Sequence, residues 1–213
     1  MRIIAGTYRS HTLAAPPGMS TRPTSDRLRE TLFNVLAPRI EGAAFLDLYA
    51  GSGAVGLEAV SRGAVHVAFV ERAPAALKVL DGNLERLGIS EGVRIYRKNV
   101  GAFLRSSAES RPKREKDPKP EKSPKPEKDP KPERYEVVFL DPPYEAAEEY
   151  AIALGLLGGE AQEILAEGAV VVAEHRRKFA LHERYGNLKR IRVLEQGDAA
   201  LSFYAIAFDA AQA

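Results

Sequence analysis

Short apolar runs alternate along most of this chain with segments in which apolar residues recur every three or four positions. The runs predict strands buried on both faces, and the periodic segments predict helices with one apolar face. The expected strands are Ala44–Leu48, Val65–Glu71, Val93–Arg97, Val137–Asp141, Val170–His175, Lys189–Leu194 and Leu201–Phe208. The expected helices are Gly53–Arg62, Pro74–Leu87, Gly101–Ser107, Ala146–Leu157 and Glu160–Ala166. Alternation of this kind is typical of a parallel sheet covered by helices.

The final two expected strands need a different connection. Only a short stretch around Gln196-Gly-Asp198 separates them, which leaves no room for a crossover helix. Such a connection predicts a hairpin, so one of its strands enters the sheet antiparallel to the others. The predicted fold class is therefore α/β, with a doubly wound, mostly parallel sheet and a terminal antiparallel hairpin.

A small extension precedes the first core strand. Arg2–Thr7 and His11–Ala15 are predicted to form a short hairpin, and Thr24–Leu36 has the apolar spacing of a helix. The chain then divides into an N-terminal extension, residues 1–40, and a larger α/β domain, residues 41–213. The extension holds six arginines against two acids, so it is the part best suited to a phosphate-bearing partner.

A low-complexity insert interrupts the larger domain. The hexapeptide Lys116-Asp-Pro-Lys-Pro-Glu121 recurs twice more, once with serine for aspartate, and proline is the one apolar residue type within 111–134. Such a composition cannot enter a core, and it predicts a solvated loop between two strands. Ten basic against six acidic side chains in this stretch could contact RNA, but alternating lysine and glutamate is more typical of a spacer.

Composition narrows the class of protein further. With 45% hydrophobic and 28% charged residues, the chain has the make-up of a globular domain. The absence of cysteine excludes disulfides and thiolate metal sites, and the four histidines lack the spacing of a metal site. We expect no metal and no membrane segment, and a cytoplasmic location, because no apolar run is long enough for a signal peptide or a membrane helix.

Residues Phe45–Gly56 combine a buried strand, a glycine-rich turn and the start of a helix. Gly51 and Gly53 permit a tight turn and let a ligand approach backbone N–H groups at the helix start. Glu71 follows Gly51 by 20 residues, at a strand end where a carboxylate can accept ribose hydroxyls. The spacing also satisfies the G-x-G-x-x-G fingerprint, so NAD is an alternative. Asp47 favours S-adenosylmethionine, because a carboxylate there suits the amino end of that cofactor and repels a pyrophosphate.

Asn99 follows the third expected strand and permits two interpretations. It could read an adenine edge, or it could cap the helix that begins near Gly101. The predicted cofactor-binding residues lie at the carboxyl ends of strands, where ligands of open α/β sheets bind. They are Asp47, Tyr49, Gly51, Ser52, Gly53, Glu71, Arg72, Asn99, Val100 and Asp141.

A second motif ends the fourth expected strand with an acid, two prolines and an aromatic ring: Asp141, Pro142, Pro143 and Tyr144. The prolines restrict the backbone, so the Asp141 carboxylate and the Pro142 carbonyl become fixed hydrogen-bond acceptors. An exocyclic amine on a base is a poor nucleophile because its lone pair is conjugated into the ring. Two acceptors on its N–H bonds can orient that lone pair, while Tyr144 stacks on the base. These four residues are the predicted catalytic residues for methyl transfer.

On these motifs the chain resembles the RsmD family, which methylates the N2 amine of a guanine in 16S ribosomal RNA. The resemblance covers nearly the whole chain. It is carried by Arg2-Ile-Ile-Ala-Gly6, Arg22-Pro-Thr-Ser-Asp26-Arg-Leu-Arg-Glu-Thr-Leu-Phe-Asn34, Leu46-Asp-Leu-Tyr-Ala-Gly-Ser-Gly-Ala-Val-Gly-Leu-Glu58-Ala and Phe139-Leu-Asp-Pro-Pro-Tyr144. It implies a Rossmann-like S-adenosylmethionine-dependent methyltransferase fold and S-adenosyl-L-methionine as cofactor. The insert at 116–133 departs from the family pattern, but it falls between strands and leaves both motifs intact.

The resemblance also implies that the extension holds RNA and that the substrate is an assembled small ribosomal subunit. We expect the protein to act as a monomer. The candidate RNA contacts are Arg2, Arg9, Arg22, Thr24, Arg27 and Arg29. One alternative is another nucleic-acid amino-methyltransferase, acting on adenine N6 or on another guanine of rRNA or tRNA. A second is a noncatalytic ribosome assembly factor. It predicts damage to the glycine-rich turn around Gly51 and Gly53 or to Asp141–Tyr144, which we call the catalytic turn, and both are intact.

Overall fold

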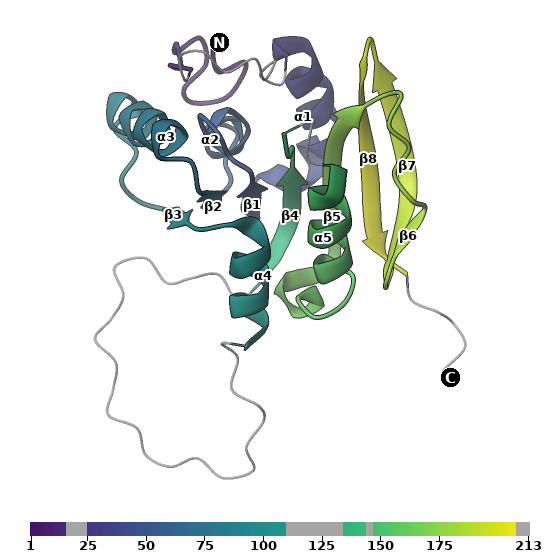
Figure 1. Cartoon of the computed structure of the whole chain (residues 1–213). Helices are drawn as coiled ribbons and strands as arrows, with labels where there is room; N and C mark the ends of the chain where they lie inside the picture. The colour runs from purple at the N-terminus through teal and green to yellow at the C-terminus, as the bar shows by residue number, and fades with distance from the viewer. Residues whose placement is uncertain (16–24, 110–133, 144–146, 208–213) are drawn as a thin grey trace, which may run out of the picture.

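The computed structural model describes residues 1–15, 25–109, 134–143 and 147–207, which form a sheet covered by helices (Figure 1). The strands are β1 (Ala44–Leu48), β2 (His66–Glu71), β3 (Val93–Arg97), β4 (Tyr135–Leu140), β5 (Leu165–Arg176), β6 (Arg184–Tyr185), β7 (Leu188–Gln196) and β8 (Ala199–Ile206). The helices are α1 (Asp26–Ile40), α2 (Ala54–Ser61), α3 (Pro74–Leu87), α4 (Val100–Glu109), α5 (Ala147–Leu157) and a 3-10 turn at Gln162–Ile164.

The described strands form one sheet in the order β3-β2-β1-β4-β5-β8-β7-β6. Strands β1 to β5 are parallel, and β8 lies antiparallel between β5 and β7. This arrangement confirms the predicted doubly wound sheet with a terminal hairpin. The chain winds away from β1 in one direction through β2 and β3, and in the other through β4 and β5. The switch point, where ligands of such sheets bind, therefore lies between β1 and β4.

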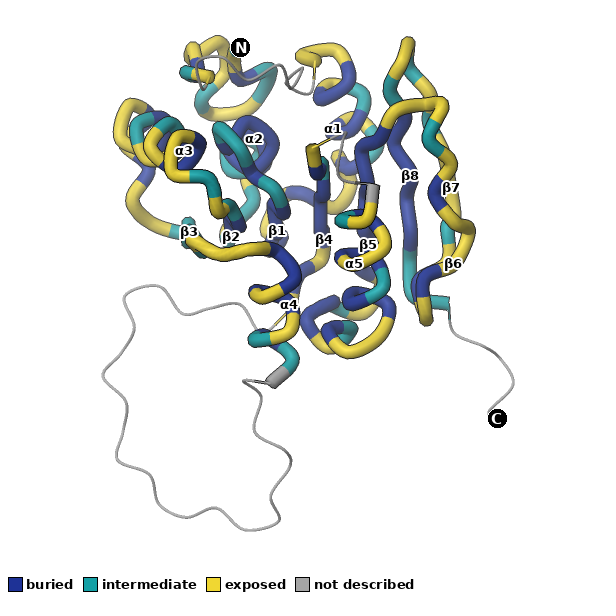
Figure 2. The backbone as a smooth tube through the Cα atoms, in the orientation of Figure 1, coloured by how far each residue is buried: buried dark blue, intermediate teal, exposed yellow. Residues whose placement is uncertain are grey.

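Helices cover both faces of the sheet. Apolar side chains of α4 and α5 pack with Leu46 and Val138 on one face, and those of α1, α2 and α3 pack with Phe45 and Phe139 on the other. Every residue of β1 is buried, so the centre of the sheet is enclosed on both sides (Figure 2). This double burial explains why the central strands are apolar runs without alternation, and it makes Asp47 conspicuous among them.

The helix predicted at Glu160–Ala166 is wrong. A single 3-10 turn forms at Gln162–Ile164, and β5 begins directly afterwards, at Leu165. Leu165 pairs with Tyr135 at the start of β4, and its side chain is buried in the core. Pairing with a neighbouring strand therefore overrides the local helical pattern.

The N-terminal hairpin predicted from Arg2–Thr7 and His11–Ala15 is confirmed in part, because the two segments pair antiparallel through one bridge, Arg2 with Thr12. Backbone bonds from the N–H of Ile3 to His11 and from the N–H of Leu13 to Met1, both 3.0 Å long, flank this bridge, but no longer strands form. Other backbone groups of the first segment bond to a helix. The N–H groups of Ile4 and Ala5 donate to the carboxylate of Glu58 in α2, at 2.7 and 3.1 Å. A side chain from another element thus takes the place of a partner strand.

Helix α1 differs from the predicted Thr24–Leu36 at both ends. Its N-cap is Ser25, whose side chain accepts a hydrogen bond from the N–H of Leu28 at 3.1 Å, and it continues through Pro38 to Ile40. The low-complexity insert predicted at 111–134 lies outside the described residues, except for Arg134. The two elements on either side of it, α4 and β4, occupy their expected places in the fold.

Candidate active site

The glycine loop and the Asp-Pro-Pro turn meet at the switch point of the sheet. Leu48 of β1 is paired with Leu140 of β4, and Tyr49 and Asp141 follow these two residues directly. Because paired strands lie about 4.8 Å apart, the two motifs begin side by side. The sequence identified both motifs, and the sheet order brings them together.

The glycine loop, residues 49–53, has an unusual backbone. The angle φ is positive at Tyr49 (63°), Gly51 (56°) and Gly53 (79°). Gly53 also has no room for a side chain, because a Cβ there would lie 2.3 Å from Leu80. At Gly51, in contrast, a Cβ would meet no atom closer than the Tyr49 carbonyl oxygen, at 4.0 Å. A ligand can therefore approach the loop backbone at Gly51, so the loop fits a cofactor.

Asp47 lies beneath the loop, with 2% of its surface exposed. Its Oδ2 accepts a hydrogen bond of 2.8 Å from the backbone N–H of Gly56, in the first turn of α2. Burial raises the pKa of Asp47 to about 7, the Gly56 bond opposes this rise, and the nearby charge of Glu71 adds to it. Asp47 therefore joins β1 to α2 and changes its protonation near neutral pH.

Glu71, at the end of β2, joins the glycine loop to the next connection. Its Oε2 accepts a hydrogen bond from the N–H of Gly51 at 2.9 Å, and its Oε1 accepts from the N–H groups of Arg72 and Ala73 at 2.8 and 2.7 Å. A carboxylate has about four acceptor positions, so these three bonds leave capacity for a ligand hydroxyl. The half-buried carboxylate is fixed in place beside the loop backbone.

Tyr49 connects the glycine loop to helix α5. Its hydroxyl donates to Oε2 of Glu149, in the first turn of α5, at 2.8 Å. Burial raises the pKa of Tyr49 above its ordinary range, the bond to Glu149 adds to this, and the charge of Arg72 acts in the opposite sense. Arg72 itself is exposed at the end of β2. Because α5 follows the catalytic turn in the chain, this bond helps to hold the two motifs together.

The strand before the catalytic turn ends one residue earlier than predicted, because β4 ends at Leu140 rather than at Asp141. Proline has no N–H to donate to a neighbouring strand, which explains why pairing stops before Pro142. Asp141 is half-buried, Pro142 is buried and Pro143 is exposed. Tyr144, the fourth predicted catalytic residue, lies outside the described residues.

Asn99 caps helix α4, because its Oδ1 accepts a hydrogen bond from the N–H of Ala102 at 3.3 Å. This bond confirms the capping interpretation. Contact with an adenine edge stays a prediction, and the Asn99 side chain is exposed. Val100 is buried in the core, so a ligand could reach its backbone rather than its side chain.

Buried polar side chains that were not predicted from the sequence hold residues 1–15, the N-terminal segment, near the glycine loop. Asn83 of α3 accepts a hydrogen bond from the N–H of Ala14 at 2.8 Å and donates to the carbonyl of Ser52 at 2.9 Å. Glu58 and Ser61 of α2 bind other backbone groups of the segment. The sequence signal that could have identified these residues is a polar residue at a position where the helix pattern expects an apolar one.

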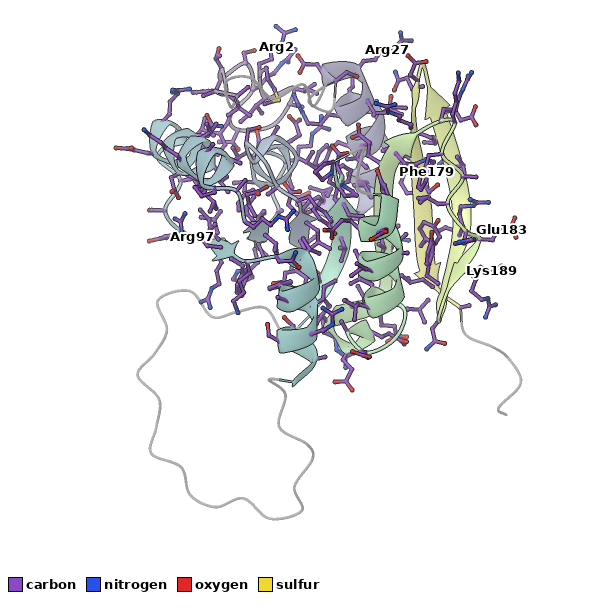
Figure 3. The ribbon with its side chains drawn as sticks, viewed as in Figure 1. Arg2, Arg27, Arg97, Phe179, Glu183 and Lys189 are labelled. Carbon is purple, nitrogen blue, oxygen red and sulfur yellow. The ribbon has the colours of Figure 1, made fainter. Side chains whose placement is uncertain are left out.

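The predicted RNA contacts other than Arg29 are either exposed or outside the described residues. Arg2, Arg9 and Arg27 are exposed, and Figure 3 shows Arg2 and Arg27 pointing outward at the same end of the molecule. Nε of Arg2 lies 3.9 Å from Oδ2 of Asp26, and both side chains are exposed. Arg22 and Thr24 lie outside the described residues.

The prediction that Arg29 contacts RNA is wrong. Its side chain is 0% exposed, and it donates to the backbone carbonyl of Arg2 and to Oδ1 of Asp26, the latter at 2.9 Å. Its Nε also lies 3.7 Å from Oε2 of the buried Glu58. Arg29 falls on the buried face of α1, so its charge is neutralised inside the protein and cannot reach a phosphate.

The described ranges contain neither a candidate metal cluster nor a helix suited to span a membrane. In residues 1–15, 25–109, 134–143 and 147–207, no group of three or more histidine, cysteine, aspartate or glutamate side chains could hold a metal ion. No helix in the described part of the chain is long and apolar enough to cross a membrane.

Comparison with known proteins places this arrangement among methyltransferases. The model of the family described as "Conserved hypothetical protein 95" matches residues 1–116 and 119–205. A Bacillus subtilis protein, "Putative rRNA methyltransferase YlbH", is 35% identical over 204 residues, which are 96% of this chain and 98% of that protein. "Ribosomal RNA small subunit methyltransferase D" of Haemophilus influenzae is 36% identical over 156 residues, 72% of this chain and 69% of that protein.

A solved structure agrees with these relatives. The "Putative methyltransferase yhhF from Escherichia coli" has a TM-score of 0.72 and 33% sequence identity to this chain, and the match covers 96% of each. The similarity therefore extends over the N-terminal segment, the sheet and the terminal hairpin together.

Proposed function

This chain belongs to the RsmD family, and from that membership we propose that it transfers a methyl group from S-adenosyl-L-methionine to the N2 amine of a guanine in 16S ribosomal RNA. The observation that carries the proposal is the meeting of the glycine loop with the Asp-Pro-Pro turn at the paired ends of β1 and β4. The names of the relatives support ribosomal RNA as the substrate.

The cofactor, when bound, supplies a methyl group on a positively charged sulfur. Glu71 would accept a hydrogen bond from a ribose hydroxyl at the acceptor position that its three backbone bonds leave. Asp47 would face the amino end, and the open approach to Gly51 would let the cofactor lie against the loop. Asn99 and the backbone of Val100 are proposed to contact the adenine.

The guanine amine is proposed to lie against the catalytic turn. The Asp141 carboxylate and the Pro142 carbonyl would accept its N–H bonds and direct its lone pair toward the methyl group. Tyr144 is proposed to stack on the base. These groups work by position and orientation, which can account for much of the rate enhancement in a transfer between two bound partners.

We propose an assembled small ribosomal subunit as the substrate, with the protein acting as a monomer in the cytoplasm. A guanine must leave its stack to reach the turn, and a nucleotide in an exposed loop does so at the lowest cost. Arg2, Arg9, Arg22, Thr24 and Arg27 would hold the surrounding phosphates.

The direct test is to map methylated nucleotides of 16S RNA by mass spectrometry in cells with and without the active protein. We expect one N2-methylguanine to disappear with the protein. Loss of a methyladenine, or of a modified guanine in another RNA, would instead support a different amino-methyltransferase. Calorimetry should detect binding of S-adenosylmethionine and not of NAD, and no binding of either would favour a noncatalytic assembly factor.

Replacing Glu71 by Ala should weaken S-adenosylmethionine binding by about 10- to 150-fold, because a hydrogen bond to a charged acceptor contributes roughly 1.5–3 kcal/mol. The change also removes the acceptor for three backbone N–H groups, so the loop should be less well ordered for the cofactor. Calorimetric titration measures the affinity. Glu85→Ala, an exposed acid on α3, is the control, and equal affinities for the two variants would contradict the role of Glu71.

Cofactor affinity should rise with pH up to about 7 if Asp47 meets the positively charged amino group. The pKa of Asp47 is raised from 3.8 to about 7, so the carboxyl group holds a proton below neutrality and must lose it to pair with a cation. Affinity should fall by up to about tenfold for each pH unit below that pKa. An Asp47→Asn variant should bind more weakly with a flat pH profile. A flat profile in the wild type would contradict this role.

The raised pKa of Asp47 also affects the stability of the fold. Between pH 3.8 and about pH 7, the two pKa values, the folded protein binds the Asp47 proton more strongly than the unfolded chain does. The contribution of Asp47 to the free energy of unfolding should therefore decrease as pH rises through that range. Urea denaturation at several pH values, with Asp47→Asn as the reference, measures this contribution, and a contribution that increases with pH would refute the assignment.

A further inference from the structure

A basic turn that the sequence reasoning did not consider lies at the end of β5. We define the β5 turn as residues Arg176–Phe179; its three basic residues, Arg176, Arg177 and Lys178, are consecutive and exposed. Leu140, the last residue of β4, pairs with Ala173, and β5 continues for three residues beyond that level. At about 3.3 Å per residue, the β5 turn begins about 10 Å beyond the level at which β4 ends, on the same edge of the sheet.

The β5 turn has a fixed position. The N–H of Phe179 donates to the carbonyl of Arg176, and the N–H of Arg177 donates to the carbonyl of Asp198 in the β7–β8 connection, both at 2.8 Å. The Phe179 ring packs against Tyr150 of α5, with ring centroids 5.6 Å apart, and Figure 3 labels it beside that helix. Because its backbone is tied to two elements, the turn can present charges to a partner with little loss of backbone entropy on binding.

The charges of the β5 turn are accessible to an external anion. Arg177 lies 4.0 Å from Glu195, at the limit of an ion pair, and both side chains are about half exposed. Exposed pairs of this kind contribute between about 0 and 1 kcal/mol, so this pair competes weakly with a phosphate. Lys178 is exposed, and the sequence has no acid from Arg176 to His182.

The β5 turn and helix α1 flank the same connection. The Thr31 hydroxyl of α1 donates to Oε1 of Gln196 at 3.0 Å, next to the Asp198 carbonyl that Arg177 binds. Arg27 lies one helical turn before Thr31 and is exposed. The N-terminal segment is bound to α1 through the carbonyl of Arg2, and it extends from there over α2 and α3, where Ala5 and Ala14 are held. Basic groups therefore stand on both sides of the switch point.

We propose that Arg177 and Lys178 bind RNA phosphates on the β5 side of the catalytic turn. The proposal rests on the proposed function, since it takes the substrate to be RNA. A nucleotide turned out of its stack keeps a phosphate on each side, and the strand leaves the site in two directions. Arg2 and Arg9 can bind phosphates of the strand in one of these directions, and the β5 turn binds phosphates in the other.

The test compares two double variants that each lose one arginine and one lysine. Arg177→Ala/Lys178→Ala alters the β5 turn. Arg184→Ala/Lys189→Ala is the matched control, because these residues pair across β6 and β7 at the far end of the hairpin, where Figure 3 labels Lys189. The measurements are the Kd for protein-free 16S RNA between about 50 and 200 mM salt, the Kd for S-adenosylmethionine, and turnover on small subunits.

The β5-turn variant should lower the slope of log affinity against log salt by about 1.4 to 1.8, because each lost phosphate contact removes about 0.7 to 0.9. The ratio of wild-type to variant affinity for RNA should therefore decrease about tenfold between about 50 and 200 mM salt. The affinity of the β5-turn variant for S-adenosylmethionine should equal that of the wild type. The control variant should match the wild type in all three measurements. Equal slopes for the two variants would overturn the proposal.

Two other results separate the proposals from each other. A defect on assembled subunits with no change in binding of protein-free RNA would mean that the β5 turn contacts a ribosomal protein, which overturns the inference and leaves the proposed methylation standing. If the wild type methylates no ribosomal RNA, the proposed function fails. The salt slopes for RNA binding would still decide whether the β5 turn binds phosphate.

Discussion

Replacing Asp141 by Ala is expected to lower the rate of methyl transfer by at least about a hundredfold, the loss seen when one positioned hydrogen-bonding group is removed from an active site. The half-buried carboxylate follows β4 beside the glycine loop, where the amine must approach the cofactor. Asp141 is also a predicted cofactor contact, but affinity for S-adenosylmethionine should change far less than the rate, because the catalytic role proposed for Asp141 is directed at the amine. Single-turnover rates with saturating cofactor, together with calorimetry, measure the two effects.

Asp141→Asn provides a closer comparison. It keeps one oxygen acceptor but introduces an N–H donor that would face the amine hydrogens, so it should recover part of the rate at most. A thermal melt should show that both variants fold. An unchanged rate for Asp141→Ala would refute the catalytic role, whereas a loss confined to cofactor affinity would make Asp141 a cofactor contact alone.

Replacing Glu58 by Ala is expected to reduce the free energy of unfolding by about 3–5 kcal/mol, the effect of removing one partner of a buried ion pair. Glu58 and Arg29 are both 0% exposed, and Glu58 also accepts hydrogen bonds from Arg62 and from the N–H groups of Ile4 and Ala5. Its loss leaves the buried charge of Arg29 with less compensation and releases the N-terminal segment. Urea denaturation measures the change.

The same Glu85→Ala control, on the exposed face of α3, should change stability by less than about 0.5 kcal/mol. Limited proteolysis adds a second measurement, because release of the N-terminal segment should expose it to cleavage in the Glu58 variant before the core unfolds. A loss in the Glu58 variant no larger than that in the control would show that the buried ion pair contributes little.

The sequence by itself determined the core elements and both motifs. Strands β1 and β3 and helix α3 have the predicted bounds, and the terminal hairpin has the predicted antiparallel strand. These elements are bounded by local signals, such as Pro74 at the start of α3 and Gly88 at its C-cap, where φ is 67°. The glycine loop and the Asp-Pro-Pro turn were equally readable, because their backbone restrictions belong to glycine and proline themselves.

Tertiary structure alone decided the role of polar groups whose partners are distant in the chain. Arg29 looked like a phosphate contact, but Asp26 and Glu58 neutralise its charge in the interior. The predicted N-terminal hairpin is reduced to one bridge, because the backbone of Ile4 and Ala5 bonds to Glu58 of α2. Leu165 was predicted to be helical, but it pairs with β4 in the sheet. The physical reason is common to these cases: a buried charge or backbone group takes whichever partner the fold brings close, and sequence spacing does not show which one that is.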